Sequence, residues 1–314
     1  MDTIVLIKIA LLIISSLIVP QPYEIRGERK INNLGITQKY KSYAKINLGL
    51  KVLNKRADEY HNIDSLFIEL DLHDTISFTA SNSFCLTTNF SNLPVDNSNL
   101  VTKVYNLLYP YKKILSSEYS IHINKKIPMG SGLGGGSSNA ATTLKALNQL
   151  WGCGFDYKNL AKLGASLGAD VPFFVEGGFQ HVTGIGEILN PQNSDILKNL
   201  HVLLIIPDIH VSTKWAYKIL NISLHSNESV HKFSPLKEPV NWQLFENDFE
   251  RVIRSTYPEI GKIKSQLYDC GAIYAGMSGS GSTVFGIFDN RDLLQSSSEY
   301  FTQCQSFITF PHIF

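Results

Sequence analysis

The sequence contains few of the patterns that mark metal sites, disulfide frameworks or nucleic-acid binding. Its four cysteines, at positions 85, 153, 270 and 304, are far apart and form no CxxC pair, and no HExxH motif occurs. The sequence therefore indicates neither a structural zinc site nor a disulfide framework. No charge of one sign dominates, because 28 basic residues stand against 27 acidic ones. A nucleic-acid-binding domain should carry a basic stripe, so we expect no nucleic-acid partner.

Long apolar segments are also scarce. Residues 9–19 (IALLIISSLIV) form a run of eleven apolar or small residues, whereas a membrane-spanning helix needs about 20. The run has the size of the apolar part of a signal peptide, and residues 24–41 then hold five Lys or Arg against two Glu. We interpret residues 1–42 as a two-part leader, a secretory signal followed by a basic transit segment, which is not part of the fold. The alternative is a disordered tail or a start site placed too far upstream. We expect no stable membrane association of the mature chain.

The remaining chain is long enough for about two domains. Alternating apolar and polar residues predict strands at 43–53, 66–72, 75–79 and 120–127, and the polar pair His73-Asp74 separates the second from the third. Further strands are expected at 201–206, 273–275 and 283–288. Helical spacing predicts helices at 99–109, 140–151, 160–167 and 251–267, the last interrupted at Pro258. Strands and helices mix without a regular βαβ repeat, so the predicted class is α+β, with a boundary in the turn-rich segment near residues 190–200.

One segment, PMGSGLGGGSSNAAT at residues 128–142, concentrates backbone freedom between a predicted strand and a predicted helix. Five of the seven residues at 130–136 are glycine, which lets backbone N–H groups approach a ligand closely. The helix N-terminus adds unpaired N–H groups and partial positive charge, and Ser137 or Ser138 is expected as its N-cap. The segment is therefore predicted to bind a phosphate chain, and the alternative is a flexible surface turn.

Two common phosphate-binding motifs do not fit this loop. The lysine of the Walker A motif GxxxxGK[ST] is missing. The loop matches GxGxxG through Gly130, Gly132 and Gly135, but a dinucleotide fold should show an acidic residue about 20 positions later at a strand end. The nearby acid, Asp156, falls in a predicted helix–helix connection. The sequence therefore favours a dinucleotide-binding oxidoreductase least among the functions that we consider.

These segments resemble the GHMP kinases, small-molecule kinases named for galactose, homoserine, mevalonate and phosphomevalonate. The triple glycine followed by SSNAAT is most similar to the 4-diphosphocytidyl-2-C-methyl-D-erythritol kinases of the non-mevalonate isoprenoid pathway. The segments YAKINLGLKVLNKRADEYHNIDSLF, LGADVPFFVEGG, GIGEIL, FENDFE and SGSGSTVF fit the same family in the expected order, over residues 43–288. The resemblance implies a two-domain α+β fold, with a ribosomal-protein-S5-like ATP-binding domain at 43–195 and a ferredoxin-like domain at 196–314.

The resemblance also implies that the glycine-rich loop binds ATP and Mg²⁺. The residues expected to cradle the ATP phosphates are Pro128, Met129, Gly130, Ser131, Gly132, Leu133, Gly134, Gly135, Gly136, Ser137 and Ser138. Of these, Ser137 or Ser138 would help to place Mg²⁺.

Two further residues are implied to be catalytic. Asp170, in the apolar segment GADVPFF, would be the base that takes the proton of the substrate hydroxyl; the alternative is an N-cap or a structural carboxylate. Lys45 would pair with Asp170, because an adjacent cation keeps a carboxylate ionised; a lone strand lysine is otherwise usually solvent-facing. Asn47 shares the face of Lys45 on the predicted strand, and we expect it to hydrogen-bond the substrate.

Tyr60, His61 and Tyr217 are implied to contact the cytosine of the substrate, because an aromatic plane stacks on a base. Tyr217 could instead be an ordinary helix-face tyrosine. Gly279 and Gly281, in a second glycine-rich turn, would let the backbone approach the reacting phosphate, whereas a plain hairpin turn is the competing interpretation. One departure from the family stands out, since Glu59 replaces the glycine that usually precedes Tyr-His. If that position needs a positive φ, the glutamate is strained by about 1 kcal/mol.

The leading hypothesis is an ATP-dependent kinase that phosphorylates the 2-hydroxyl of 4-diphosphocytidyl-2-C-methyl-D-erythritol. A mevalonate or homoserine kinase is the nearest rival, but those substrates carry no base for Tyr60 and His61. A non-catalytic ligand-binding relative is the third, and the retention of Lys45 and Asp170 argues against it. The expected partner is a small molecule with a cytidine diphosphate group, and a homodimer is left open.

The leader bears on where the chain works. Secretion would separate an ATP-dependent enzyme from its ATP, so the leader favours a plastid of the apicoplast type, reached through the secretory route. A cytoplasmic location with a misread start site is the alternative.

Overall fold

The structure is a computed structural model that describes residues 35–113, 118–223, 233 and 239–313. The predicted leader at residues 1–42 therefore lies outside the described residues except for its last eight. Among the described residues, no helix has the length and apolar character needed to cross a membrane.

Two β-sheets organise the described residues, which belong to one compact unit. The first sheet has the strand order β3-β4-β2-β5-β6, with β1 paired to β2, and only β3 and β4 run parallel. Its strands are β1 (Thr37–Lys55), β2 (His61–Ser81), β3 (Cys85–Thr88), β4 (Glu118–Asn124), β5 (Phe179–Thr183) and β6 (Ile188–Pro191). The second sheet is antiparallel throughout, with the order β10-β7-β9-β8. Its strands are β7 (His201–Ile206), β8 (Tyr274–Met277), β9 (Val284–Phe288) and β10 (Gln305–Thr309).

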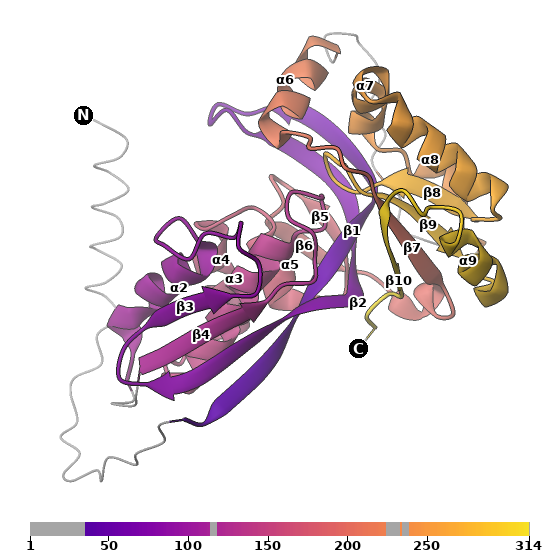
Figure 1. The fold of residues 1–314 in the computed structure, drawn as a ribbon. Helices are drawn as coiled ribbons and strands as arrows, with labels where there is room; N and C mark the ends of the chain where they lie inside the picture. Colours follow the sequence, from indigo (N-terminus) through magenta and orange to yellow (C-terminus); the bar gives the residue numbers. More distant parts are fainter. Residues whose placement is uncertain (1–34, 114–117, 224–232, 234–238, 314) are drawn as a thin grey trace, which may run out of the picture. The chain divides into compact units, whose positions relative to one another are not determined.

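Each sheet has its own set of helices (Figure 1). The helices of the first sheet are α2 (Leu100–Leu108), α3 (Gly135–Leu150), α4 (Tyr157–Ala165) and α5 (Val171–Glu176). Those that follow β7 are α6 (Thr213–Ser223), α7 (Asp248–Thr256), α8 (Pro258–Asp269) and α9 (Arg291–Ser298). Short 3-10 turns lie at Tyr109–Tyr111, Ser194–Leu197 and Trp242–Leu244. The mixture of two sheets and their helices confirms the predicted α+β class.

Three apolar clusters hold these layers together. One packs the first sheet against its helices, around Phe78, Leu144 and Trp151. Another packs α7, α8 and neighbouring elements against the second sheet. The third draws residues from both sheets, including Ile46 of β1 and Phe285 of β9. Because this third cluster joins the sheets, the first sheet and the second are held in contact by buried apolar side chains. The predicted division into domains at residues 195 and 196 stays a prediction.

Three expectations about the elements are corrected. The first strand begins at Thr37 rather than at residue 43, because residues 37–42 pair with residues 74–79 of β2, so the end of the predicted leader belongs to the sheet. The polar pair His73-Asp74 does not divide β2, since the Asp74 carboxylate is fully hydrogen-bonded inside the protein. Neither Ser137 nor Ser138 is the N-cap of α3, which begins earlier, after Gly134 in a left-handed conformation with φ 72°.

Candidate active site

A pocket of about 1250 Å³ collects the predicted site residues from distant parts of the sequence. It is lined by β1, by the connection between β1 and β2, by the glycine-rich loop before α3, by Asp170 before α5, by α6, and by the turn between β8 and β9.

The glycine-rich loop adopts a backbone that other residues would resist. Gly130, Gly132 and Gly134 have φ values of 65°, 82° and 72°, in the left-handed region that glycine occupies without a steric penalty. A Cβ atom on Gly132 would lie 2.3 Å from the carbonyl oxygen of Ser278, and one on Gly134 would lie 2.6 Å from the ring of Phe174. The glycines therefore serve both the turn and its close packing.

Nine of the eleven predicted loop residues line the pocket: Pro128, Met129, Gly130, Ser131, Gly132, Gly134, Gly135, Gly136 and Ser137. Leu133 is buried in the core between the sheets, and its carbonyl oxygen accepts a hydrogen bond of 3.1 Å from the backbone N–H of Lys45. Ser138 is 1% exposed, and its hydroxyl lies 2.8 Å from that of Ser42. Of the two serines predicted to help place Mg²⁺, Ser137 lines the pocket, whereas Ser138 is not among its lining residues. That either serine holds Mg²⁺ stays a prediction.

Asp170 lines the same pocket as the loop, and its side chain does not cap a helix. It occupies the N-cap position of α5, yet its side chain makes no capping hydrogen bond. Its carboxylate is 32% exposed, and Oδ2 lies 3.5 Å from Nζ of Lys45. A partly exposed carboxylate in a pocket, held beside a buried cation, is available to a ligand.

Lys45 is buried rather than solvent-facing, with 3% of its surface exposed. Its Nζ donates a 2.6 Å hydrogen bond to Oδ1 of Asn47 and lies 4.6 Å from the centre of the Phe67 ring. The amide of Asn47 in turn donates to the hydroxyl of Ser65 at 3.2 Å. Lys45 and Asn47 can meet because β1 places them on the same face. Their contacts hold the ammonium next to Asp170.

The second glycine-rich turn packs directly on the first. The hydroxyl of Ser278 donates to the carbonyl oxygen of Gly132 at 3.0 Å. The side-chain amide of Asn247 donates to the carbonyl oxygens of Met277 and Gly279, at 2.7 and 2.8 Å. The second turn is therefore held by hydrogen bonds to the glycine-rich loop and to Asn247, the N-cap of α7.

The two predicted glycines of this turn have different places. Gly279 has φ 60° and lines the pocket. Gly281 has φ 90°, and a Cβ atom there would lie 2.9 Å from the sulfur of Met277. Gly281 thus serves the packing of the turn, while Gly279 faces the pocket.

Aromatic residues form one wall of the pocket. His61 and Tyr217 stack with their ring centres 5.2 Å apart and their planes inclined by 23°. Burial, with a smaller contribution from the charge of Asp170, raises the pKa of Tyr217 to about 12. Tyr60 also lines the pocket but is 58% exposed. The predicted base-binding residues therefore meet in one place, within electrostatic reach of Asp170.

Several residues of the site were missed in the sequence. Lys125, Asn99, Lys214 and Lys218 line the pocket, and Ser278 and Asn247 support its turns. Asn247 stands within the FENDFE segment, and Lys125 stands three residues before the loop, so proximity to a motif was the available signal. Among the described residues, no group of three or more His, Cys, Asp or Glu could hold a metal ion.

Comparison with known proteins agrees with this geometry. The model of the GHMP kinases N terminal domain matches residues 99–178, and that of the GHMP kinases C terminal matches residues 229–301. A 4-diphosphocytidyl-2-C-methyl-D-erythritol kinase from Thermodesulfovibrio yellowstonii is 40% identical over 83% of this chain and 93% of its own length. The kinase of the same name from Chlorobium limicola is 39% identical over 80% of this chain and 88% of its own length.

Solved structures show the same relationship. The crystal structure of a 4-(cytidine 5'-diphospho)-2C-methyl-D-erythritol kinase superposes with a TM-score of 0.72 at 26% identity, covering 88% of this chain and all of that one. The mevalonate kinase of Methanococcus jannaschii has a TM-score of 0.65 at 14% identity over 90% of this chain and 99% of its own, a likeness of fold alone. The chain belongs to the GHMP kinase family and, within it, to the 4-diphosphocytidyl-2-C-methyl-D-erythritol kinases.

Proposed function

We propose that this chain transfers the γ-phosphate of ATP to the 2-hydroxyl of 4-diphosphocytidyl-2-C-methyl-D-erythritol. The observation that carries the proposal is the Lys45–Asp170 pair, 3.5 Å apart, in a pocket that also contains the glycine-rich loop and the stacked His61 and Tyr217. Phosphoryl transfer needs positioning, neutralised phosphate charge and a hydroxyl that can lose its proton. The pocket offers a residue for each of these needs.

The loop fits the phosphates of ATP. It precedes α3, a helix of 16 residues whose N-cap is a glycine without a side-chain cap. The first N–H groups of a helix lack intrahelical partners and favour an anion. For Mg²⁺, the chemistry of the described residues fits an ion held mainly by phosphate oxygens, with Ser137 as the hydroxyl that lines the pocket. When bound, Mg²⁺ would neutralise phosphate charge.

Asp170 is the base in this proposal. Its carboxylate would accept the proton of the 2-hydroxyl, and the Lys45 ammonium, 3.5 Å away, would help to orient the reacting groups. Nζ of Lys45 donates a 2.6 Å hydrogen bond to Asn47, which helps to hold the cation beside Asp170. Gly279, at the surface of the second turn, leaves room for backbone to approach the transferred phosphate.

The aromatic wall supports a substrate with a base. The His61 and Tyr217 rings stack, and Tyr60 adds an exposed ring beside them. Stacking of a base on an aromatic side chain is worth about 1–3 kcal/mol. Mevalonate and homoserine carry no such ring, so this wall favours the cytidine compound over the substrates of the sibling kinases.

A turnover assay tests the proposal. The full chain is incubated with Mg-ATP and the cytidine compound, with mevalonate and homoserine in parallel and Asp170→Asn as control. We expect phosphorylation of the cytidine compound alone, reduced about 10²–10⁴-fold in Asp170→Asn. Binding of the cytidine compound without turnover would instead support a non-catalytic ligand-binding relative, with Glu59→Gly as the first reversion to try.

We also propose that the segment before β1, which begins at Thr37, directs the chain to a plastid through the secretory route. The apolar run at residues 9–19 and the basic segment that follows support this proposal. Fusion of residues 1–42 to a fluorescent reporter would test it in a cell with such a plastid. A diffuse cytosolic signal would contradict the proposal and favour the cytoplasmic alternative.

A further inference from the structure

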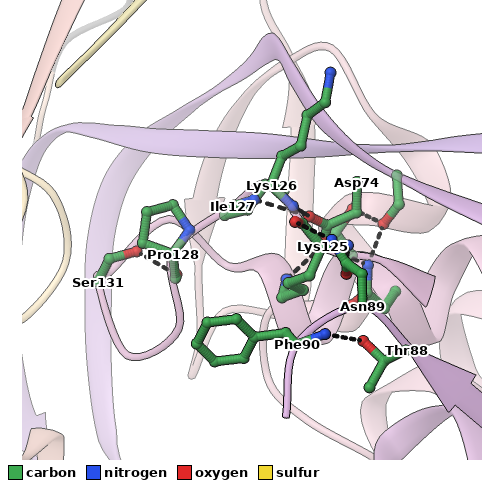
Figure 2. A network of polar contacts seen from close by, with 12 residues as sticks. Asp74, Thr88, Asn89, Phe90, Lys125, Lys126, Ile127, Pro128 and Ser131 are labelled. Atoms are coloured by element: carbon green, nitrogen blue, oxygen red, sulfur yellow. Dashed lines mark hydrogen bonds and ion pairs between the residues drawn. The ribbon is translucent and has the colours of Figure 1, made fainter. Parts of the chain in front are cut away.

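A carboxylate outside the pocket holds the strand that enters the glycine-rich loop. Asp74 lies in β2 and has an exposed fraction of 0%. Its Oδ1 accepts hydrogen bonds from the backbone N–H groups of Lys126 and Ile127, at 2.7 and 2.8 Å. Figure 2 shows these bonds at the point where the chain turns toward Pro128. The entry to the loop is therefore tied to β2.

The same carboxylate also holds the other end of the loop. Oδ2 of Asp74 accepts a 2.9 Å hydrogen bond from the side-chain amide of Asn139, which lies in the first turns of α3. Asn139 donates in addition to the hydroxyl of Ser42 at 2.9 Å, and that hydroxyl lies 2.8 Å from the hydroxyl of Ser138. One buried side chain thus connects the residues before the loop with those after it.

The fourth partner of Asp74 is a cation in the wall of the pocket. Nζ of Lys125 forms an ion pair with Oδ2, and the lysine side chain is only 5% exposed. A Cβ atom on Gly135 would lie 2.7 Å from this Nζ, so the ammonium sits against the start of α3. The backbone of Lys125 is held as well, because its N–H donates to Oδ1 of Asn89 at 2.7 Å (Figure 2).

Such anchoring matters because the loop is rich in glycine. Glycine loses more conformational freedom on ordering than any other residue, so a loop with fixed ends loses less when it closes on a phosphate chain. Preorganised donors are also worth more than donors that must be reoriented. Asp74 itself cannot touch a ligand in the pocket, since it is completely buried.

We propose that Asp74 is a positioning residue for the phosphate-binding loop. It fixes both ends of the loop and the Lys125 ammonium, and it thereby sets the affinity for the nucleotide without contributing to the cytidine site. The inference rests on the proposed use of ATP. A network that served only the stability of the fold would lower the melting temperature and leave the relative affinities for the two substrates unchanged.

The variant Asp74→Asn tests this role. It keeps the shape of the side chain but replaces one carboxylate oxygen, which accepts from two donors, by an NH₂ group that cannot accept a hydrogen bond. We expect KM for ATP and the Kd of a fluorescent ADP analogue to rise about tenfold or more, while KM for the cytidine compound stays within about twofold. Asp64→Asn is the matched control, because Asp64 is 1% exposed and binds His181 and the backbone N–H of Phe233 away from the loop. It should lower the melting temperature without changing the nucleotide constants.

A second variant decides the case if Asp74→Asn does not fold. Ser42→Ala removes the hydroxyl that links Asn139 to Ser138, at a position that is 0% exposed. We expect a smaller rise in the Kd of the ADP analogue, about threefold, with a nearly unchanged melting temperature. Unchanged nucleotide constants in both variants, or equal losses for both substrates, would overturn the inference. Turnover of the wild-type chain is measured separately. If the wild type does not phosphorylate the cytidine compound but the variants bind the ADP analogue more weakly, the proposed substrate is wrong and the role of Asp74 is still supported.

Discussion

At the scale of single residues, the backbone of Glu59 carries a steric strain. Glu59 has φ 70°, in the region where side chains other than glycine are disfavoured. Its carboxylate pairs with Lys55, but the side chain is 81% exposed, and an exposed ion pair contributes little. The glutamate therefore occupies a glycine-type position at the turn that carries Tyr60 and His61.

Replacing this residue by glycine should stabilise the protein. We expect Glu59→Gly to raise the free energy of unfolding by up to about 1 kcal/mol, because the steric cost of the left-handed conformation disappears. Urea denaturation measures the change. Glu59→Ala is the control, since it removes the ion pair and keeps the strain. A gain of equal size in Glu59→Ala would assign the effect to the carboxylate rather than to the backbone.

The buried ammonium of Lys45 gives a second prediction at this scale. Lys45→Met keeps the apolar stem but removes the charge beside Asp170, so we expect kcat to fall about 10²–10³-fold with a small change in KM for either substrate. Steady-state kinetics measure the change. Lys41→Met is the control, because Lys41 lies on the same strand with its side chain 54% exposed. A comparable loss in Lys41→Met would argue against a specific role for Lys45.

At the scale of elements, the C-terminal segment after β10 docks on β2. The backbone N–H of Asp71 donates to the carbonyl oxygen of Phe310 at 3.0 Å, and the N–H of His312 donates to the carbonyl oxygen of Glu69 at 2.8 Å. The His312 ring stacks on Tyr43 with ring centres 4.0 Å apart. A segment that follows a strand of the second sheet thus adds hydrogen bonds to the first.

This docking should depend on pH. Burial, more than the nearby charges, lowers the pKa of His312 below its ordinary value of 6.5, although Asp71 opposes the shift. Because the folded state disfavours the protonated ring, the stability from His312 is present above pH 6.5 and is lost as pH falls through the lowered pKa. His312→Phe can keep the stack on Tyr43 but cannot be protonated. We expect the melting temperature of this variant to fall less than that of the wild type when the pH is lowered from 7.5 to 5. Identical losses in the two proteins would contradict this.

Elements whose signals are local could be predicted from the sequence, and those that depend on distant partners could not. The strand at His201–Ile206 and the break between α7 and α8 at Pro258 are confirmed, since apolar composition and proline act locally. The division of β2 at His73-Asp74 is wrong, because four donors distant in sequence satisfy Asp74. The strand β10 was not predicted, as it is defined by pairing with β7 about 100 residues earlier.

The site divides in the same way. The glycine-rich loop and the segment around Asp170 are motifs, and their residues were found from the sequence. The supporting groups, such as Asn247 and Asp74, act through contacts between elements that no local pattern records. The contact between the hydroxyls of Ser138 and Ser42 has the same origin, because the two residues are distant in sequence and only the fold brings them together.

At the scale of the whole molecule, the core between the two sheets should make the chain unfold as one unit. Ile46, Leu66 and Val202 belong to this cluster with Phe285, so both sheets lose buried surface if either one unfolds. Calorimetry of the wild type should therefore show a single transition.

A substitution inside this shared core tests the coupling directly. Phe285 of β9 is completely buried in it, and we expect Phe285→Ala to cost about 3–5 kcal/mol. Phe288 is the matched control, since it lies on the same strand and is equally buried, but in a cluster formed mainly by the second sheet and its helices, to which β1 adds Leu50 and Val52. Both variants should lose similar stability, yet Phe285→Ala weakens the contact between the sheets more than Phe288→Ala does, so it should broaden the transition or divide it into two while Phe288→Ala keeps it sharp. A single sharp transition in Phe285→Ala, or a divided one in Phe288→Ala, would show that the cooperativity has another source.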